Sequence, residues 1–256
     1  MRYVGADGCR AGWFWVGFDG EGRWAVGVAA DAAALRDAHP DAERILMDVP
    51  VGLRGGGEEE RLCDLRAREL LRPERAASVF PAPCRPAVRA DDPDEASEIN
   101  RKHTGRGLSA QTRAILPRVR EVDRLLARRT EARGIVREMH PEVAFWGLNG
   151  GRTVVPPKSE REGLVERLAV LDAHDPRAPR VASAALLAFP RNRVARDDVL
   201  DALAGAVTAS RRRLRTLPRE PETDPEGLPM EMVFWAPEEP GSGDARPAHG
   251  GGSPGA

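Results

Sequence analysis

Five carboxylates stand where an α/β fold would bring them together at one edge of a sheet. Asp7 ends the first strand-like run, Asp48 lies near the end of the fourth, and Glu142 follows the fifth. Asp198 and Asp201 open a long apolar segment with helical character. Hard divalent cations prefer oxygen ligands. We therefore expect Asp7, Asp48, Glu142, Asp198 and Asp201 to be catalytic, with Asp7, Asp48, Asp198 and Asp201 holding Mg²⁺ or Mn²⁺.

Asp201 is the most informative of these residues, because the segment 199–207 (Val-Leu-Asp-Ala-Leu-Ala-Gly-Ala-Val) contains no other polar side chain. A helix this apolar is expected to be buried, and a buried carboxylate must be paired, hydrogen-bonded or bound to a metal. Asp198 lies one turn earlier on the same face. The small residues beside them, Ala202, Gly205 and Ala209, would let the helix approach the sheet closely.

Each of these residues also has a purely structural interpretation. Asp7 precedes Gly8 and could be a turn residue, and Asp48 could cap the turn before Pro50. Asp198 could be a helix N-cap. Glu142 could pair with one of the many arginines, and His140 beside Pro141 is more typical of a structural hydrogen-bonding histidine than of a metal ligand. The joint placement of the carboxylates favours the metal site.

The order of elements predicts an α/β fold of the RNase H-like type. Alternating apolar runs and turn signals indicate strands, a helix and a long later helix. The expected core elements are strands at 2–6, 12–18, 23–29, 43–49 and 134–139, and helices at 32–38 and 197–213. We expect a mixed five-stranded sheet of order 3-2-1-4-5 flanked by helices, in which strands one, four and five carry their carboxylates to neighbouring ends.

Residues 54–133 are expected to form a mainly helical insertion beside the acidic edge. It should hold a helix at 58–71, an irregular proline-rich stretch at 81–93, and a longer helix capped by Ser109 and kinked at Pro117. The apolar stripe of that helix would be Ile115, Val119, Val122 and Leu126.

The rest of the chain is expected to complete one domain over residues 1–236. A capping box at Ser159 and Glu162 indicates another helix, and residues 228–235 a last strand. The Gly- and Pro-rich residues 237–256 predict a disordered tail.

Composition limits the classes of protein that this chain could be. A formal net charge of -1 over 256 residues carries no general affinity for nucleic acid, so any such affinity must come from a local patch. Three scattered cysteines argue against a disulfide framework. No apolar run is long enough for a membrane span and no signal peptide is visible, so we expect a cytoplasmic protein that does not enter membranes. The oligomeric state is not indicated.

Basic residues could contact phosphate groups of a nucleic-acid substrate. Arg10, Arg75, Arg85 and Lys158 are the candidates, and Arg72 and Arg89 of the insertion could assist. Almost all positive charge is arginine, which a GC-rich genome explains equally well, and the arginine-rich run of the insertion could also be a solvated loop.

The chain resembles the domain-of-unknown-function 429 family, commonly described as predicted nucleases of RNase H fold. The resemblance covers Val4 to about Trp235. It rests on six motifs, Gly-Ala-Asp-Gly-Cys-Arg (5–10), Met-Asp-Val-Pro-Val-Gly-Leu (47–53), Ser-Val-Phe-Pro-Ala-Pro (78–83), Gly-Leu-Ser-Ala-Gln (107–111), Arg-Glu-Met-His-Pro-Glu (137–142) and Asp-Asp-Val-Leu-Asp-Ala-Leu (197–203). The pair Asp198 and Asp201 is also similar to the last helix of Holliday-junction resolvases, although those sites usually have glutamate where this chain has Asp48.

The resemblance and the carboxylates together favour a metal-dependent nuclease. Two ions about 4 Å apart would activate water and stabilise the leaving oxygen, with Asp7 bridging them, Asp48 completing one site and Asp198 or Asp201 the other. A nucleotide-dependent phosphotransferase or ATPase of the actin type is the first alternative, but it would need a duplicated core and glycine-rich phosphate loops. The second is a non-catalytic binding protein of the same fold.

Overall fold

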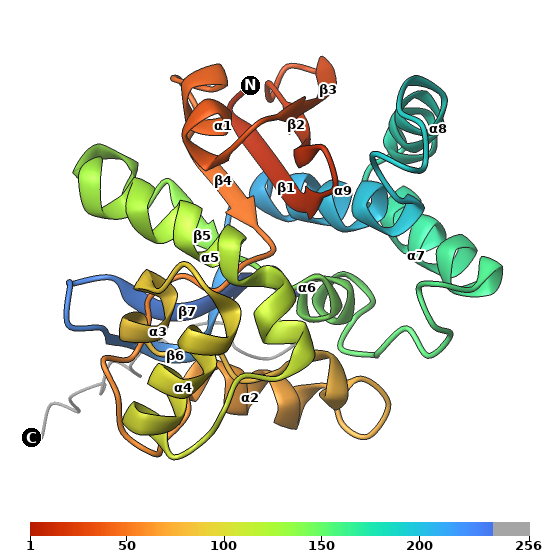
Figure 1. Cartoon of the computed structure of the whole chain (residues 1–256). Coiled ribbons are helices and arrows are strands. Elements are labelled where there is room, and N and C mark those ends of the chain that lie inside the picture. Colours follow the sequence, from red (N-terminus) through yellow and green to blue (C-terminus); the bar gives the residue numbers. More distant parts are fainter. Residues whose placement is uncertain (238–256) are drawn as a thin grey trace, which may run out of the picture.

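A mixed five-stranded sheet lies at the centre of the computed structural model, which describes residues 1–237 (Figure 1). Its strands are β1 (Tyr3–Cys9), β2 (Gly12–Phe18), β3 (Trp24–Ala29), β4 (Arg44–Met47) and β5 (Val136–Glu138). The order is β3-β2-β1-β4-β5, with β1, β2 and β3 antiparallel and β4 and β5 parallel to β1. The expected strand order 3-2-1-4-5 is confirmed. The tail expected at 237–256 falls, beyond Pro237, outside the described residues.

Helices cover both faces of this sheet, because the strands alternate their buried side chains between two apolar layers. One layer joins Phe14 and Leu46 to α6 (Pro141–Leu148), α7 (Arg161–His174), α8 (Ala178–Ala188) and α9 (Arg196–Ala209). The other joins Trp13 and Ile45 to α1 (Ala32–Ala38) and α5 (Ala110–Arg128). In Figure 1, α9 crosses behind β1.

The contact between α9 and β1 is a backbone contact. A Cβ atom on Gly5 would lie 2.1 Å from the carbonyl oxygen of Ala202 and 2.2 Å from the amide nitrogen of Ala206. A Cβ on Gly205 would lie 2.9 Å from the Cα of Gly5. The close approach expected from the small residues of this helix is confirmed, and it brings Asp201 against the sheet.

Between β4 and β5 the regular elements are helical, as expected. They are α2 (Leu62–Leu70), η1 (Ala76–Ser78), α3 (Arg85–Arg89), α4 (Pro93–Thr104), α5 and η2 (Thr130–Ala132). The expected start at residue 58 was wrong, because Arg61 has an extended backbone and its side chain turns into a buried ionic network. The stretch 81–93 is not wholly irregular, since it contains α3 and Pro93 begins α4 behind the cap of Asp92.

Elsewhere three elements were not expected, namely α6, α8 and β6 (Arg215–Thr223), which pairs with β7 (Pro229–Phe234) in a second, two-stranded sheet. The capping box at Ser159 was wrong, because α7 begins at Arg161 behind Glu160 and no side chain caps it. The last helix ends at Ala209 rather than at residue 213. Ser109 caps α5 as expected, by accepting a hydrogen bond from the Thr112 amide.

Two further expectations concern the whole described chain. None of its helices combines the length and the apolar character that crossing a membrane requires. Cys9, Cys63 and Cys84 are buried and unpaired, which agrees with the expected lack of a disulfide framework.

Candidate functional site

Strand register places Asp7 beside Asp48. Ala6 of β1 pairs with Met47 of β4 in the parallel ladder, so Asp7 within β1 and Asp48 directly after β4 are neighbours. The Asp48 amide donates a hydrogen bond of 3.0 Å to the Ala6 carbonyl and keeps the two ends aligned. Asp7 accepts a hydrogen bond of 2.7 Å from the Gly8 amide through Oδ1.

Helix α9 brings the third carboxylate to this edge. Asp7 points to the same face of β1 as Gly5, since residues two apart along a strand share a face. Asp201 lies one turn before Gly205 on α9, so the contact between Gly5 and Gly205 holds Asp201 over Asp7. One ligand oxygen from each of Asp7, Asp48 and Asp201 lies within 4.8 Å of the others. Three distant parts of the sequence therefore supply one compact group of oxygen atoms.

The three carboxylates are in an unfavourable electrostatic environment. Burial and the neighbouring Asp48 and Asp201 hold the pKa of Asp7 well above its usual range. Burial raises the pKa of Asp48 to about 7 and that of Asp201 to about 6, although the Lys158 charge opposes both shifts. Asp201 is 1% exposed, and its Oδ1 has no hydrogen-bond partner among the described residues. A buried carboxylate oxygen without a partner fits a metal ligand.

Lys158 supplies positive charge to this group. Its Nζ lies 2.6 Å from Oδ2 of Asp201 and 3.8 Å from Oδ2 of Asp197. Burial lowers the pKa of Lys158, but the charges of Asp201, Asp7 and Asp48 outweigh this effect and the pKa is raised. The side chain expected to contact substrate phosphate therefore lies among the carboxylates.

Glu142 and Asp198 lie beside the group of three and are not part of it. Glu142 stands in the first turn of α6 and accepts a hydrogen bond of 2.6 Å from the buried guanidinium of Arg167. Asp198 accepts a hydrogen bond of 2.8 Å from the Ala195 amide and so caps α9 from its first turn. Both line the cavity described next.

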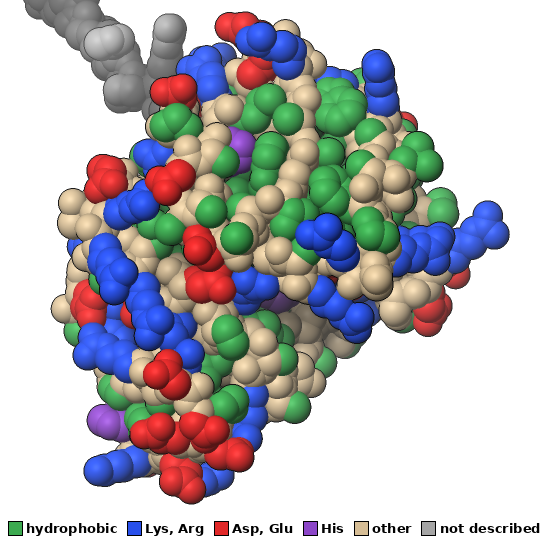
Figure 2. Space-filling model, turned by 45° about the horizontal axis from the view of Figure 1, so that its top comes forward, with side chains coloured by type: hydrophobic (Ala, Val, Ile, Leu, Met, Phe, Trp, Pro, Cys, Tyr) green, Lys and Arg blue, Asp and Glu red, His purple; other side chains and the backbone are tan. Residues whose placement is uncertain are grey.

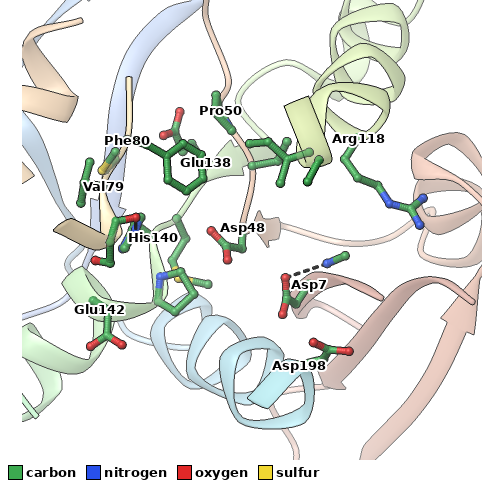
Figure 3. Close-up of a pocket in the computed structure, with 18 of the residues that line it drawn as sticks. Asp7, Asp48, Pro50, Val79, Phe80, Arg118, Glu138, His140, Glu142 and Asp198 are labelled. Atoms are coloured by element: carbon green, nitrogen blue, oxygen red, sulfur yellow. Dashed lines mark hydrogen bonds between the residues drawn. The ribbon is translucent and has the colours of Figure 1, made fainter. Parts of the chain in front are cut away.

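A cavity of about 640 Å³ opens at Asp7 and Asp48, between the sheet edge and the helical segment. Figure 2 shows a hollow near the middle of the visible face, with Lys or Arg side chains along its rim. Figure 3 shows Phe80 and His140 on one side of Asp48, and Arg118 on the other. Sequence reasoning missed several lining residues, because neither their spacing nor their types indicate that they meet, among them Arg61, Asp64, Phe80, Arg118 and Glu138.

The basic residues expected at phosphate groups fall into two sets. Arg10 and Lys158 line the cavity, and within residues 1–237 no hydrogen bond or ion pair engages the exposed Arg10. Arg85 is buried among Asp123, Asp224 and Glu226, and Arg75 donates to the carbonyls of Val154 and Val155. Arg89 pairs with Glu226 at 2.7 Å. Arg72, Arg75, Arg85 and Arg89 do not line the cavity, so they have no place in the proposal below.

The model of one protein family matches residues 5–223 of the chain, which is most of its length. The chain belongs to the DUF429 family. That family is described as a protein of unknown function, so membership establishes kinship and no activity. The chain matches no curated protein and no solved structure.

In this DUF429 protein a buried ionic network supports the loop that follows Asp48. The Arg61 guanidinium donates hydrogen bonds to Glu138 at 2.7 and 2.9 Å, to Asp64 at 2.5 and 3.1 Å, and to the carbonyls of Val51 and Gly52. Glu138 also accepts a hydrogen bond of 2.7 Å from the Val51 amide. Burial raises the pKa of Glu138 to about 7, although Arg61 opposes the shift. The network therefore ties β5 and the start of α2 to the chain that leaves Asp48.

His140 belongs to the same wall of the cavity in a structural role. Its Nε2 lies 3.3 Å from the Ser78 carbonyl, and its Nδ1 is buried without a hydrogen-bond partner in the described chain. Burial lowers the pKa of His140, so the ring is neutral at physiological pH. A neutral ring that donates from Nε2 to Ser78 agrees with the structural interpretation of this histidine.

Proposed function

We propose that this protein is a metal-dependent phosphodiesterase that hydrolyses nucleic acid, with Mg²⁺ or Mn²⁺ held by Asp7, Asp48 and Asp201. The convergence of one oxygen from each of these residues within 4.8 Å is the observation that carries the proposal. The unpartnered Oδ1 of Asp201 supports it independently, because a buried carboxylate oxygen is costly unless something positive engages it.

The donor set fits a hard cation. Carboxylate oxygens are the ligands that Mg²⁺ and Mn²⁺ prefer. When bound, such an ion supplies Lewis-acid charge against an oxygen of the scissile phosphate. We assign Asp7, Asp48 and Asp201 to one ion, and Asp198 is left as a neighbour because its carboxylate caps α9.

Other residues of the cavity would hold the substrate. Arg10 has an exposed and unengaged guanidinium among the described residues, so it is free to pair with a phosphate at the cavity mouth. Hydrolysis adds water across the P–O bond, with the hydroxyl oxygen joining phosphorus and a proton reaching the leaving oxygen. Lys158 lies among the carboxylates and lines the cavity, so its flexible side chain could pair with the substrate phosphate once an ion neutralised the carboxylates.

The phosphotransferase alternative has less support. The described chain contains a single copy of the five-stranded sheet and a separate two-stranded sheet, whereas an actin-type enzyme needs two copies of the core.

Purified protein incubated with single-stranded, duplex, hybrid and branched nucleic acids tests the proposal. We expect cleavage of at least one substrate with Mg²⁺ or Mn²⁺, abolition by EDTA, and loss in Asp48→Asn. Metal-dependent hydrolysis of nucleoside triphosphates without any cleavage of nucleic acid would instead support the phosphotransferase.

A further inference from the structure

The position of the carboxylates limits how a phosphodiester can reach them. Asp201 is 1% exposed and lies behind Lys158, and Asp7 is also buried. The cavity in front of them is concave and about 640 Å³ in volume. Pockets of about 300–1,000 Å³ hold single small molecules, whereas proteins that read a duplex insert a helix or ribbon into a groove about 12 Å wide. A single nucleotide therefore matches the size of this cavity better than a stretch of stacked duplex does.

The walls of the cavity differ in chemistry on the two sides of Asp48. Phe80 and His140 lie on one side, with Val79 and the carboxylate of Glu138 near them (Figure 3). The Phe80 ring is half-buried in a loop and makes no ring contact with another aromatic side chain of the described chain. Such a ring offers a stacking face to a planar ligand.

The opposite side carries a basic side chain. Arg118 lines it, with its guanidinium donating to the Cys9 carbonyl at 2.9 Å and to Glu121 at 3.0 Å. The unengaged Arg10 follows Cys9 in the chain and also lines the cavity. The cavity therefore has an aromatic ring on one side, carboxylates in the middle and a basic side chain on the other side. Its volume is that of one small ligand.

We propose that the substrate enters as a single unpaired nucleotide of a nucleic-acid strand, with its base against Phe80 and its adjoining phosphate at the carboxylates. This inference rests on the proposed nuclease function. A nucleotide must leave its stack to enter such a pocket, and aromatic side chains hold extruded or single-stranded bases by stacking. Arg10 then meets the phosphate of the neighbouring nucleotide outside the cavity.

The test compares two oligomers of whichever nucleic acid the wild type cleaves, one with bases and one of equal length built from abasic units. The measured quantity is the ratio of kcat/KM for the two oligomers. We expect Phe80→Leu to lower this ratio about tenfold or more, because one stacked base is lost, and Phe80→Trp to preserve it. Phe189→Leu is the matched control, since Phe189 packs edge-on against Phe14 outside the cavity and the ratio should stay at the wild-type value. The base-containing strand should also be cleaved at least about tenfold faster alone than in a blunt duplex.

An unchanged ratio in Phe80→Leu, or equal cleavage of duplex and single strand, would overturn the inference while leaving the nuclease proposal intact. A wild type that cleaves nothing with Mg²⁺ or Mn²⁺ sinks the nuclease proposal instead. In that case the pocket can still be tested by binding. The fluorescence of an oligonucleotide that contains 2-aminopurine is measured as protein is added. A change in fluorescence on binding to the wild type and not to Phe80→Leu supports the base site. No change, or binding of the free mononucleotide as tight as that of the strand, overturns it.

Discussion

Lys158 Nζ lies 2.6 Å from Oδ2 of Asp201, on a side chain that is 41% exposed while its partner is 1% exposed. The ammonium group reaches from the surface into a buried carboxylate group, where it neutralises part of the charge. A long flexible side chain can leave such a position at little cost in packing. A divalent cation bound as proposed would therefore compete with Lys158 for the negative charge of the same carboxylates.

This competition predicts that Lys158→Met tightens metal binding. Removing one positive charge beside three carboxylates should lower the Kd for Mn²⁺ by about tenfold, since a unit charge a few ångströms away contributes on the order of 1 kcal/mol or more. The metal-free protein should melt at a lower temperature at pH 8, because the carboxylates lose their counter-charge. Isothermal titration and thermal melting measure both effects.

The chain offers a matched control, because Lys102 is its one other lysine and is exposed on α4. Lys102→Met should bind Mn²⁺ as the wild type does. Weaker Mn²⁺ binding by Lys158→Met would show that the lysine helps to build the site rather than competing for it.

Asp201→Asn should abolish activity without unfolding the protein. Outer-shell partners of metal ligands already contribute about 10–100-fold to affinity or activity, so loss of a ligand should cost at least about 100-fold in kcat/KM. The metal-free melting temperature at pH 8 should be equal or higher, because one of several crowded negative charges is gone. Melting curves with and without 10 mM Mg²⁺ check this directly.

Asp197→Asn is the control for that substitution. Asp197 is one turn away on α9 and partly exposed, and it lies outside the group of three. Mg²⁺ should raise the melting temperature of Asp197→Asn as much as that of the wild type. Marked destabilisation of metal-free Asp201→Asn, together with no Mg²⁺ effect on the wild type, would mean that Asp201 exists to hold Lys158.

The raised carboxyl pKa values predict that the metal-free protein loses stability as pH rises. Asp48 and Asp201 have folded-state pKa values of about 7 and about 6, above the ordinary value of 3.8. The folded state therefore binds more protons than the unfolded state between pH 4 and pH 7, and unfolding becomes easier as pH increases through that range. The melting temperature should fall between pH 5 and pH 8, by about 2–4 °C for each kcal/mol lost.

His39 acts in the opposite direction, since burial lowers its pKa to about 4 and its stabilising effect is lost as pH falls below 6.5. The melting temperature of Asp48→Asn should therefore also be measured over pH 5–8. Its fall with rising pH should be smaller than in the wild type, because one carboxylate is gone, whereas the contribution of His39 remains. Saturating Mg²⁺ should flatten the wild-type slope in the same way. A wild-type slope equal to that of Asp48→Asn would contradict the raised pKa of Asp48.

The elements that position Asp7, Asp48 and Asp201 were predictable because local sequence patterns mark them. Alternating apolar residues marked β1 to β5, and the single polar side chain in the apolar helix marked Asp201. Small residues at 202 and 205 indicated the close approach that the structure confirms. Local patterns of this kind are fixed by burial on one face of an element.

The rest depended on tertiary contacts that spacing does not encode. Arg85 resembled a phosphate contact in the sequence, yet three carboxylates from two later segments surround it. Lys158 was expected at the substrate, and the sequence did not indicate that it pairs with Asp201, 43 residues away along the chain. The strand β6, exposed along much of its length and rich in polar residues, carries too little apolar alternation to be recognised.

The approach of α9 to β1 yields the last prediction. A Cβ on Gly5 would lie 2.1–2.5 Å from three backbone atoms of α9, so Gly5→Ala requires the helix to move by about 1 Å to restore contact distances. Overpacking of this kind costs about 1–3 kcal/mol and sometimes more. We expect the melting temperature of Gly5→Ala to fall by about 5–10 °C.

Gly205→Ala should lower the stability less than Gly5→Ala does. Its Cβ would lie 2.9 Å from the Cα of Gly5 and 3.1 Å from the flexible end of Met139. Alanine also favours the helix by about 1 kcal/mol relative to glycine. Gly55→Ala is the control, since its nearest neighbour is Pro225 Cγ at 3.4 Å. The same shift of α9 separates Asp201 from Asp7, so folded Gly5→Ala should bind Mn²⁺ more weakly at 10 °C, whereas Gly55→Ala should not. If Gly5→Ala melts with the wild type and binds Mn²⁺ as tightly, the backbone contact does not place Asp201, and the assignment of the third ligand fails with it.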